Sequence, residues 1–291
     1  MIFARDLSTP EAPVLLKDRS WLVVEMGLER GCVTHISADG RGKRMLAKTG
    51  RPNGLALDRD GVIWVAESLN PPSLIRLTMD GKAEVAVTEC DGESFLFPND
   101  LAFGPDGAIY MTDSGIALAK LAPGGELNPD FMNLKYDGRV YRIDPKTKKG
   151  TKLDSGFQFT NGIAFDSDKN LYVNETMTGM VYRYQWKAGK VVTKREEFGN
   201  VVAPGGAPGL KGPDGMKFGA NGNLYVAVFG QGDITVLGPD GTVVKRLKTG
   251  GMLPSNLAFG PPGEKRIYVT EDETGTLEVI DVDCDGLPLY T

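Results

Sequence analysis

A sequence motif that predicts two strands recurs along the whole chain of 291 residues. Each copy begins with a polar residue, often after proline, and continues as a short apolar strand. It then turns at Asp, Gly or Asn and ends in a second apolar strand, usually with an acidic last residue. Clear copies span residues 52–67, 98–113, 160–175, 213–227 and 254–271. Self-similarity of this kind is the signature of repeat architectures, so it constrains the fold more than any other feature.

A sixth, degraded copy opens the chain at residues 10–25. Glu11 precedes Glu25 by the same 14 residues that separate Asn53 from Glu67. Each unit continues with two more alternating strands, several followed by Asp-Gly hairpin signals. Four strands per unit without helical periodicity predict an all-β, six-bladed β-propeller forming a single domain over residues 1–291. We expect residues 2–6 to supply a strand that closes the ring, and the last blade to reach residues 287–290.

Composition excludes several classes of partner. The net charge is −5 and no Lys/Arg cluster stands out, which disfavours nucleic acid and anionic membranes as partners. No run of 18 apolar residues occurs, and the N-terminus lacks the basic and apolar regions of a secretory signal. The three cysteines are far apart, as suits a reducing compartment. We therefore expect a cytoplasmic monomer or small homo-oligomer that acts on a small molecule.

The chemistry is expected at one mouth of the central channel. In a propeller the first strand of every blade lines the channel, so the first residues of these strands form a ring. Six residues occupy these positions, and all offer oxygen and none sulfur or imidazole: Glu11, Asn53, Asn99, Asn161, Asp214 and Ser255.

This ring predicts a site for one divalent metal ion at the channel mouth. Oxygen ligands with two carboxylates favour calcium, with magnesium, manganese or zinc as other possibilities. Without a cation, two carboxylates facing each other across a narrow channel would repel, and one would stay protonated. The alternative is that these are ordinary turn residues, since Asn and Asp favour such positions through bonds to the backbone.

Other recurring or unusual segments have structural or pocket-forming interpretations. The acids that end the second strands recur so regularly that a structural role is expected: Glu25, Glu67, Asp113, Glu175 and Glu271. Residues 114–138 form an insertion in blade three with several apolar side chains, which predicts a lid or pocket wall on the metal face. A merely variable surface loop is the alternative. Residues 204–209 are a second candidate wall.

Several catalytic mechanisms are improbable. The single histidine, His35, falls on a third strand away from the channel, which disfavours Ser-His-Asp and Cys-His mechanisms. No Gly-x-Ser-x-Gly motif, CxxC pair or histidine cluster is present. A hydrolytic reaction here would have to depend on a metal and a carboxylate.

Four segments resemble those of the regucalcin (senescence marker protein)/gluconolactonase/luciferin-regenerating enzyme-like family. Residues 11–14 are similar to its Glu-x-Pro-Val opening, and residues 160–163 to its Asn-Gly metal-ligand segment. Residues 212–216 resemble its Pro-Asp-Gly-Met segment, the most specific of the four. Residues 98–100 resemble its Asn-Asp substrate segment.

The resemblance implies metal ligation by Glu11, Asn161 and Asp214. It also implies that Asn99 orients substrate or water, that Asp214 acts as general base, and that the reaction is lactone hydrolysis. One position departs from the pattern, because sugar-lactonase members often carry arginine where this chain has Phe97.

That departure, with the apolar insertion, favours a less polar lactone or ester. The side chains expected to contact substrate are Asn53, Phe97, Asn99, Phe131 and Met132. Other functions stay open, because a fold does not fix a function. They are a propeller phosphotriesterase, a paraoxonase-like esterase, a strictosidine-synthase-like enzyme and a non-catalytic calcium-binding or protein-binding propeller.

Overall fold

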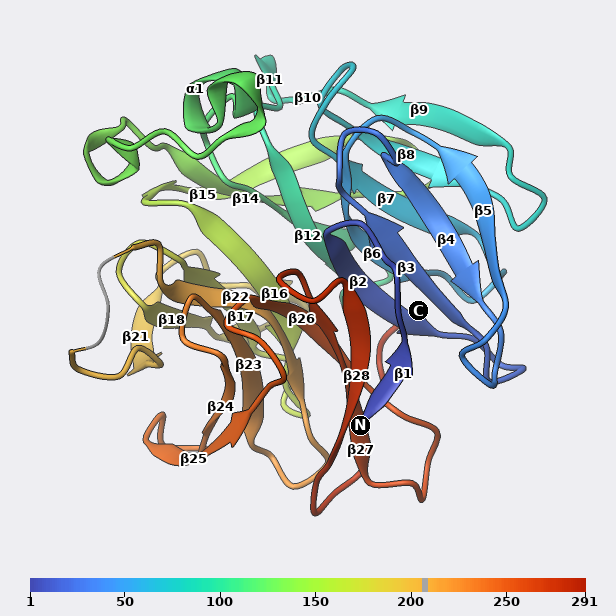
Figure 1. Ribbon diagram of the computed structural model, residues 1–291. Coiled ribbons are helices and arrows are strands. Elements are labelled where there is room, and N and C mark those ends of the chain that lie inside the picture. Colours follow the sequence, from blue (N-terminus) through green and yellow to red (C-terminus); the bar gives the residue numbers. More distant parts are fainter. Residues whose placement is uncertain (206–208) are drawn as a thin grey trace.

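The computed structural model describes residues 1–205 and 209–291. Six four-stranded antiparallel sheets are arranged as the blades of a propeller, which confirms the predicted fold (Figure 1). Blades one to three are formed by β2(Pro10–Leu15), β3(Trp21–Glu25), β4(Cys32–Ile36) and β5(Lys43–Lys48); β6(Pro52–Leu57), β7(Ile63–Glu67), β8(Ser73–Leu77) and β9(Ala83–Val87); and β12(Pro98–Phe103), β13(Ile109–Asp113), β14(Gly138–Ile143) and β15(Gly150–Phe157).

The remaining blades follow the same order from the channel outward. They are formed by β16(Thr160–Phe165), β17(Leu171–Glu175), β18(Met180–Tyr184) and β21(Glu196–Asn200); β22(Gly212–Phe218), β23(Leu224–Phe229), β24(Asp233–Leu237) and β25(Val243–Lys248); and β26(Pro254–Phe259), β27(Arg266–Glu271), β28(Thr276–Asp281) and β1(Ile2–Ala4). Two small hairpins lie outside the blades, β10(Glu89–Cys90) with β11(Glu93–Ser94) and β19(Trp186–Lys187) with β20(Lys190–Val191).

The ring closes as the sequence predicts. Strand β1 pairs with β28, so the N-terminus supplies the outermost strand of the last blade. The prediction for the other end was wrong. After β28 the chain leaves the blade, and residues 285–291 cross to the far end of the channel. The reason is that the edge of β28 is already occupied by β1, so no place is left there for a C-terminal strand.

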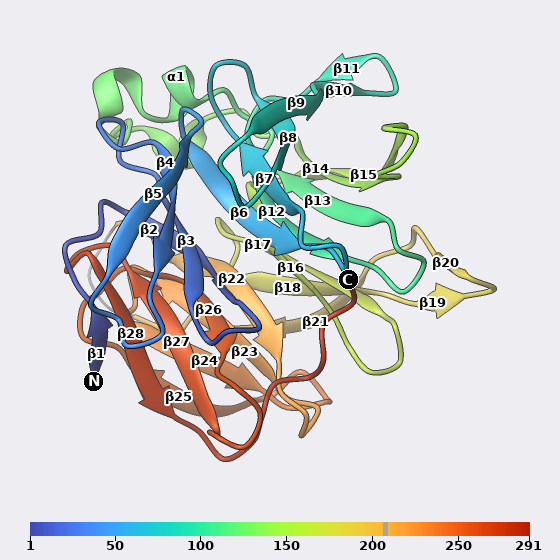
Figure 2. The same cartoon turned by 90° about the vertical axis from the view of Figure 1, so that its right-hand side faces the viewer.

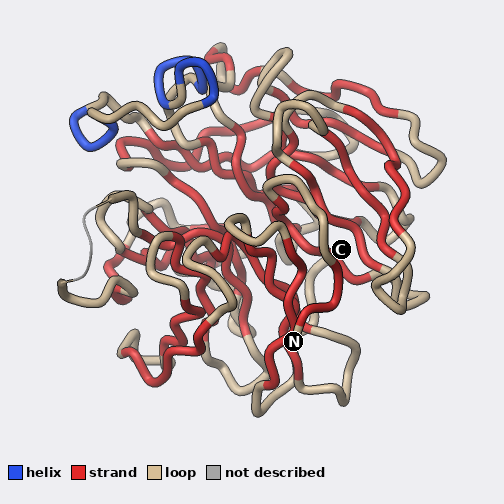
Figure 3. Tube along the Cα trace, viewed as in Figure 1, coloured by secondary structure: helices blue, strands red, loops and turns tan. Residues whose placement is uncertain are grey.

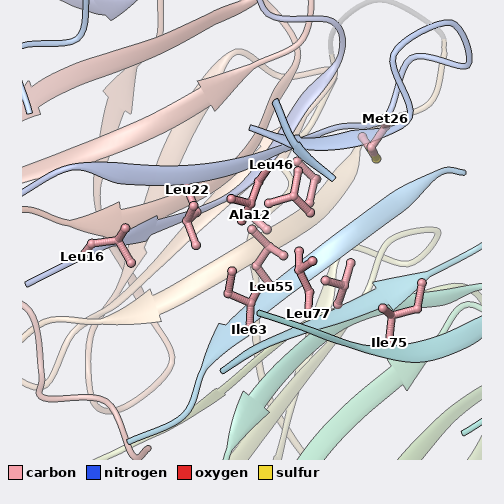
Figure 4. Packing of buried hydrophobic residues seen from close by; sticks show 12 residues of the cluster. Ala12, Leu16, Leu22, Met26, Leu46, Leu55, Ile63, Ile75 and Leu77 are labelled. Atoms are coloured by element: carbon pink, nitrogen blue, oxygen red, sulfur yellow. The ribbon is translucent and has the colours of Figure 1, made fainter. Parts of the chain in front are cut away.

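The core lies between neighbouring blades. Apolar side chains on facing sheets interdigitate, and one such cluster joins blades one and two, including Leu22, Leu55, Ile63 and Leu77 (Figure 4). Strands and loops make up nearly all of the fold (Figure 3). The short helices α1(Leu118–Leu121), η1(Pro123–Gly125) and η2(Phe131–Asn133) all belong to the insertion in blade three. Within the described residues, no helix has the length and hydrophobicity to cross a membrane.

Candidate metal centre

The first residues of the six inner strands share one backbone irregularity. In each of β2, β6, β12, β16, β22 and β26 the pairing register shifts just after the strand begins. Bulges of this kind bend a strand and change the direction in which side chains point. Here they are repeated around the whole channel mouth, where the sequence predicts the oxygen ring.

Asn99 and Asn161 are held in the same way. The Asn99 Nδ2 donates to Ser114 Oγ at 3.0 Å, and the Asn161 Nδ2 donates to Thr176 Oγ1 at 3.3 Å. Each hydroxyl residue directly follows the acid that ends the neighbouring strand. The Oδ1 atoms of both asparagines are buried and have no hydrogen-bond partner among the described residues. Because unpaired buried oxygens are costly, these two atoms are poised to accept from a ligand or coordinate a cation.

Glu11 presents a third oxygen of this kind. Its side chain is 1% exposed, and its Oε1 accepts a hydrogen bond of 2.8 Å from Asn256 Nδ2. Its Oε2 is buried without a partner in the described part of the chain.

Ser255 lies beside Glu11, and the next residue, Asn256, joins it there. The Ser255 hydroxyl donates to the Pro10 carbonyl oxygen at 2.7 Å and lies 2.8 Å from Thr270 Oγ1. The register shift between Pro254 and Asn256 brings both side chains to blade one, where hydrogen bonding by Ser255 and Asn256 lowers the pKa of Glu11 against the effect of burial. Asn256 is thus a further residue at the mouth, beside the predicted Ser255.

Two glycines make room for the larger side chains of this layer. A Cβ atom on Gly215 would lie 1.9 Å from Asn256 Cγ, and a Cβ on Gly54 would lie 2.7 Å from the Asp100 Cα. The residue after the ring position is Gly or Ala in four blades and Asp100 or Asn256 in the other two. Small and large residues at this position are thus complementary across neighbouring blades.

The acidic groups at the mouth lie within electrostatic reach of one another. Burial, followed by the charge of Asp100, raises the pKa of Glu11 to about 7. Burial and then the charge of Glu11 raise the pKa of Asp214 well above its usual range, with smaller contributions from Asp272 and Asp100. Burial also raises the pKa values of Asp100 and Asp272. Such a cluster is relieved by a bound cation or by protonation.

Arg51 is a residue at this mouth that the sequence analysis missed. Its guanidinium carbon lies 5.1 Å from the centre of the Phe97 ring, and its Nη1 donates to Ser68 Oγ at 3.1 Å. Burial lowers the pKa of Arg51, while the charges of Asp272 and Glu67 act in the opposite sense. Its sequence position was a signal. Arg51 lies two residues before Asn53 in blade two, as Phe97 lies two residues before Asn99 in blade three.

Phe97 belongs to an apolar wall formed with the blade-three insertion. Its ring packs edge-to-face against Phe159 at a centroid distance of 5.8 Å. Ile116 and Leu121 complete the buried cluster, so the insertion lies on the mouth face. Of the remaining predicted substrate residues, Asn53 is buried and forms no side-chain hydrogen bond to any described residue.

Phe131 and Met132 lie in the insertion but not in its buried cluster. Phe131 is half-buried on η2, and the Met132 side chain is 57% exposed. The role of both residues in binding substrate stays a prediction. Of the second candidate wall, residues 204–209, positions 206–208 lie outside the described residues.

The acids at the ends of the second strands have the structural role that the repeat predicts. The Asp113 carboxylate accepts from the backbone N–H groups of Leu96, Phe97 and Gly115 at 2.7–3.0 Å. Glu67 accepts from two backbone N–H groups in the same manner. These carboxylates thus fix the loops that carry the mouth residues.

The oxygen atoms at the mouth suit a hard cation that is bound by only two carboxylates. No group of three or more His, Cys, Asp or Glu side chains placed to hold a metal is found within the described residues. Glu11, Asn161 and Asp214 instead combine two carboxylates with an amide oxygen. Glu11 and Asn161 each offer a buried oxygen with free lone pairs, so the residues present fit an oxygen-ligated dication.

The family model of the SMP-30/Gluconolactonase/LRE-like region matches residues 69–272, well over half of the chain. The chain belongs to this family. Diisopropyl-fluorophosphatase of Loligo vulgaris is 29% identical, covering 94% of this chain and 88% of the relative. A gluconolactonase of Zymomonas mobilis is 27% identical over 90% of this chain and 76% of the relative. The family resemblance expected from the four segments is therefore confirmed.

Solved structures of relatives share the fold. A gluconolactonase of Xanthomonas campestris superposes with a TM-score of 0.79 at 24% identity, covering 97% of this chain and 89% of that one. Regucalcin of Agrobacterium tumefaciens, described as a calcium-binding protein, gives a TM-score of 0.77 at 18% identity, covering 100% and 96%. At these identities the likeness establishes the six-bladed architecture.

Proposed function

We propose that this chain is a metal-dependent hydrolase that opens a lactone or ester less polar than a sugar lactone. Membership of the lactonase class rests on relatives named gluconolactonase and lactonase. One observation carries the metal dependence. Glu11, Asn99 and Asn161 each bury one oxygen without a partner, while the other polar atom of the same side chain is anchored by a hydrogen bond.

Glu11, Asn161 and Asp214 would hold the dication. When bound, the dication would polarise the carbonyl of the substrate and lower the pKa of a nearby water. Because the donors are all oxygen and the carboxylates few, calcium fits this set best, with magnesium, manganese and zinc as alternatives.

The other roles follow from how the side chains are held. Asp214 is half-buried at the mouth and takes the proton from the attacking water. Ser114 fixes the Asn99 amide so that Oδ1 faces the mouth, where it orients water or substrate. Asn53 and the insertion residues Phe131 and Met132 contact the substrate from the sides.

The preference for a less polar substrate rests on the wall at the mouth. Phe97, Phe159, Ile116 and Leu121 form a buried apolar cluster that backs this side of the mouth and offers no group to hydrogen-bond sugar hydroxyls. Burying the hydroxyls of a sugar lactone against such a wall would cost free energy, whereas an alkyl or aryl group would gain it.

A proton-release assay tests the proposal. Aliphatic, aromatic and sugar lactones are compared with and without chelator, using wild type and Asp214→Ala. We expect turnover of aliphatic or aromatic lactones that is lost on chelation and restored by calcium, and no turnover by a folded Asp214→Ala variant. Full activity in that variant would refute the mechanism. Metal-dependent thermal stability without any turnover would favour the non-catalytic calcium-binding propeller.

A second candidate function is phosphotriester hydrolysis. It is favoured by the similarity to diisopropyl-fluorophosphatase over 94% of this chain. The same metal and carboxylate could act on a phosphoryl centre, because both reactions need a polarised oxygen and an activated water. Fluoride release from a dialkyl phosphorofluoridate, measured beside the lactone panel, ranks the two substrate classes by kcat/KM.

A further inference from the structure

A cavity of about 630 Å³ lies inside the propeller beneath the metal centre. Its walls are the inner strands below their first residues, and most of the lining is aliphatic or aromatic: Leu55, Leu101, Phe103, Ile163, Phe165 and Phe259. Apolar cavities of this kind are poorly hydrated and bind apolar molecules. The proposed hydrolysis uses none of these side chains.

The C-terminal segment lines the far end of this cavity. The Leu287 N–H donates to the Phe218 carbonyl oxygen at 2.9 Å, which fixes the segment beneath blade five. The Tyr290 ring packs edge-to-face on Phe165 at 5.9 Å, and Arg59 Nη2 donates to the Thr291 carbonyl oxygen at 3.1 Å. Figure 2 shows this red segment ending near the blades opposite those from which it departs. The C-terminal segment thus covers part of the cavity at this end and leaves it partly open.

Two charged groups lie at the end of the cavity nearest the metal centre. Lys217 on β22 has its Nζ 4.0 Å from the Asp100 Oδ2, and both residues line the cavity. The Lys217 ammonium makes no hydrogen bond within residues 1–205 and 209–291. Asp100 is 1% exposed, and its Oδ2 is one of the buried oxygens without a described partner. Because 4.0 Å is too long for a hydrogen bond, the N–H groups of Lys217 and the Oδ2 of Asp100 both remain available to a ligand.

The chemistry of this pair selects its ligand. A hydroxyl group can accept a hydrogen bond from the Lys217 ammonium and donate its own hydrogen to Asp100 Oδ2. A carboxylate has no hydrogen for Asp100, an ammonium group has no lone pair for Lys217, and an ether can accept from Lys217 but has no hydrogen to donate. The walls require an apolar remainder. We propose that this cavity is a second binding site, which takes a neutral alcohol with an apolar body and seats its hydroxyl between Lys217 and Asp100.

The test compares three probes of similar length on the metal-loaded protein by isothermal titration calorimetry. The probes are 1-octanol, octyl methyl ether and octanoate. We expect 1-octanol to bind about tenfold more tightly than the ether, as one additional hydrogen bond to a charged group allows, and octanoate not to bind. Equal affinity for the alcohol and the ether, or no binding of 1-octanol, would overturn the proposal.

Variants distinguish this cavity from the metal centre. Lys217→Met should remove the preference for the alcohol, and Ala102→Phe on β12, whose side chain lines the cavity, should abolish binding of both neutral probes. Asn99→Ala at the mouth should leave binding of 1-octanol unchanged.

A crystal soaked with 1-octanol gives the second readout. If Lys217→Met does not fold, the Ala102→Phe variant and the soaked wild-type crystal decide. Density for water alone between Lys217 and Asp100, or for octanol at the mouth only, would contradict the assignment. None of these results depends on whether lactones are hydrolysed.

Discussion

The Asn256 amide donates a hydrogen bond of 2.8 Å to Glu11 Oε1, which joins blade six to blade one at the channel mouth. The same side chain accepts the Leu257 N–H through its Oδ1, so both of its ends are fixed. This contact therefore links the last blade to the first and directs the free Glu11 oxygen toward the proposed metal site. This coupling makes the integrity of the metal site depend on the seam between the first and last blades.

Replacing Gly215 by alanine should weaken metal binding. The added Cβ would lie 1.9 Å from Asn256 Cγ, so the amide must move and Glu11 loses its donor. We expect calcium affinity to fall about tenfold, equivalent to one hydrogen bond to a charged group, when measured by competition with a chelating dye. The double variant Gly215→Ala/Asn256→Ala should recover thermal stability but not affinity. Unchanged affinity in both variants would show that Asn256 does not position Glu11.

The metal-free protein should lose stability as the pH rises. The folded-state pKa of Glu11, about 7, exceeds its ordinary value of 4.5, so the folded protein retains the proton over that interval. Between these values the folded state binds more protons than the unfolded state, and the free energy of unfolding decreases with increasing pH. Bound calcium removes this dependence because it favours the carboxylate.

Thermal melting in chelator at several pH values between about 4.5 and 7 checks the prediction against the calcium-loaded protein. Glu11→Gln provides the control, because it cannot titrate and should make the pH dependence of the metal-free protein less steep, with the remaining slope due to the other buried acids. A metal-free wild type whose melting temperature rises over this interval relative to Glu11→Gln would contradict the expected sign.

The repeat predicted the architecture because every blade must present the same strand pattern to its neighbours. The degraded first copy is recognisable from the spacing between Glu11 and Glu25. By contrast, Asn256 was not predicted beside Ser255, because the residue after the first polar position is Gly or Ala in four blades. The register shift in β26 brings both side chains to Glu11. Likewise, nothing in residues 285–291 indicated that they would leave the last blade and cover the channel.

The anchoring hydroxyls show a signal that sequence reading could have used. Ser114 and Thr176 each follow the acid at the end of a second strand, and each holds the asparagine of its own blade. Blade two also has Ser68 after Glu67, but there the hydroxyl donates to the Arg51 carbonyl oxygen instead. Arg51 was not predicted as a site residue, because a single arginine before a proline has many possible roles.

Removing the Asp113 carboxylate should destabilise the fold strongly. Its oxygens accept from three backbone N–H groups at 2.7–3.0 Å, and Asp113→Ala would leave these buried donors unpaired. We expect a loss of about 3 kcal/mol in the free energy of unfolding, measured with urea. Asp39→Ala is the control, since that carboxylate lies in an exposed turn and should matter far less. Comparable losses in both variants would refute a structural role specific to the strand-end acids.

Truncating Phe97 should change the choice of substrate. Its ring is buried between the Arg51 guanidinium and Phe159 and forms part of the apolar wall. Phe97→Ala removes the ring against which Phe159 and the insertion pack, so the mouth loses the support of its apolar side and we expect kcat/KM for an aliphatic lactone to fall about tenfold. The value for a sugar lactone should change little, since its hydroxyls gain nothing from that wall. The measurement is kcat/KM on both lactones at a temperature where each variant remains folded.

Met79→Ala is the control for the loss of a large apolar side chain away from the mouth, since Met79 lies partly exposed in the turn after β8. A uniform loss on both substrates would mean that Phe97 supports the fold without selecting the substrate.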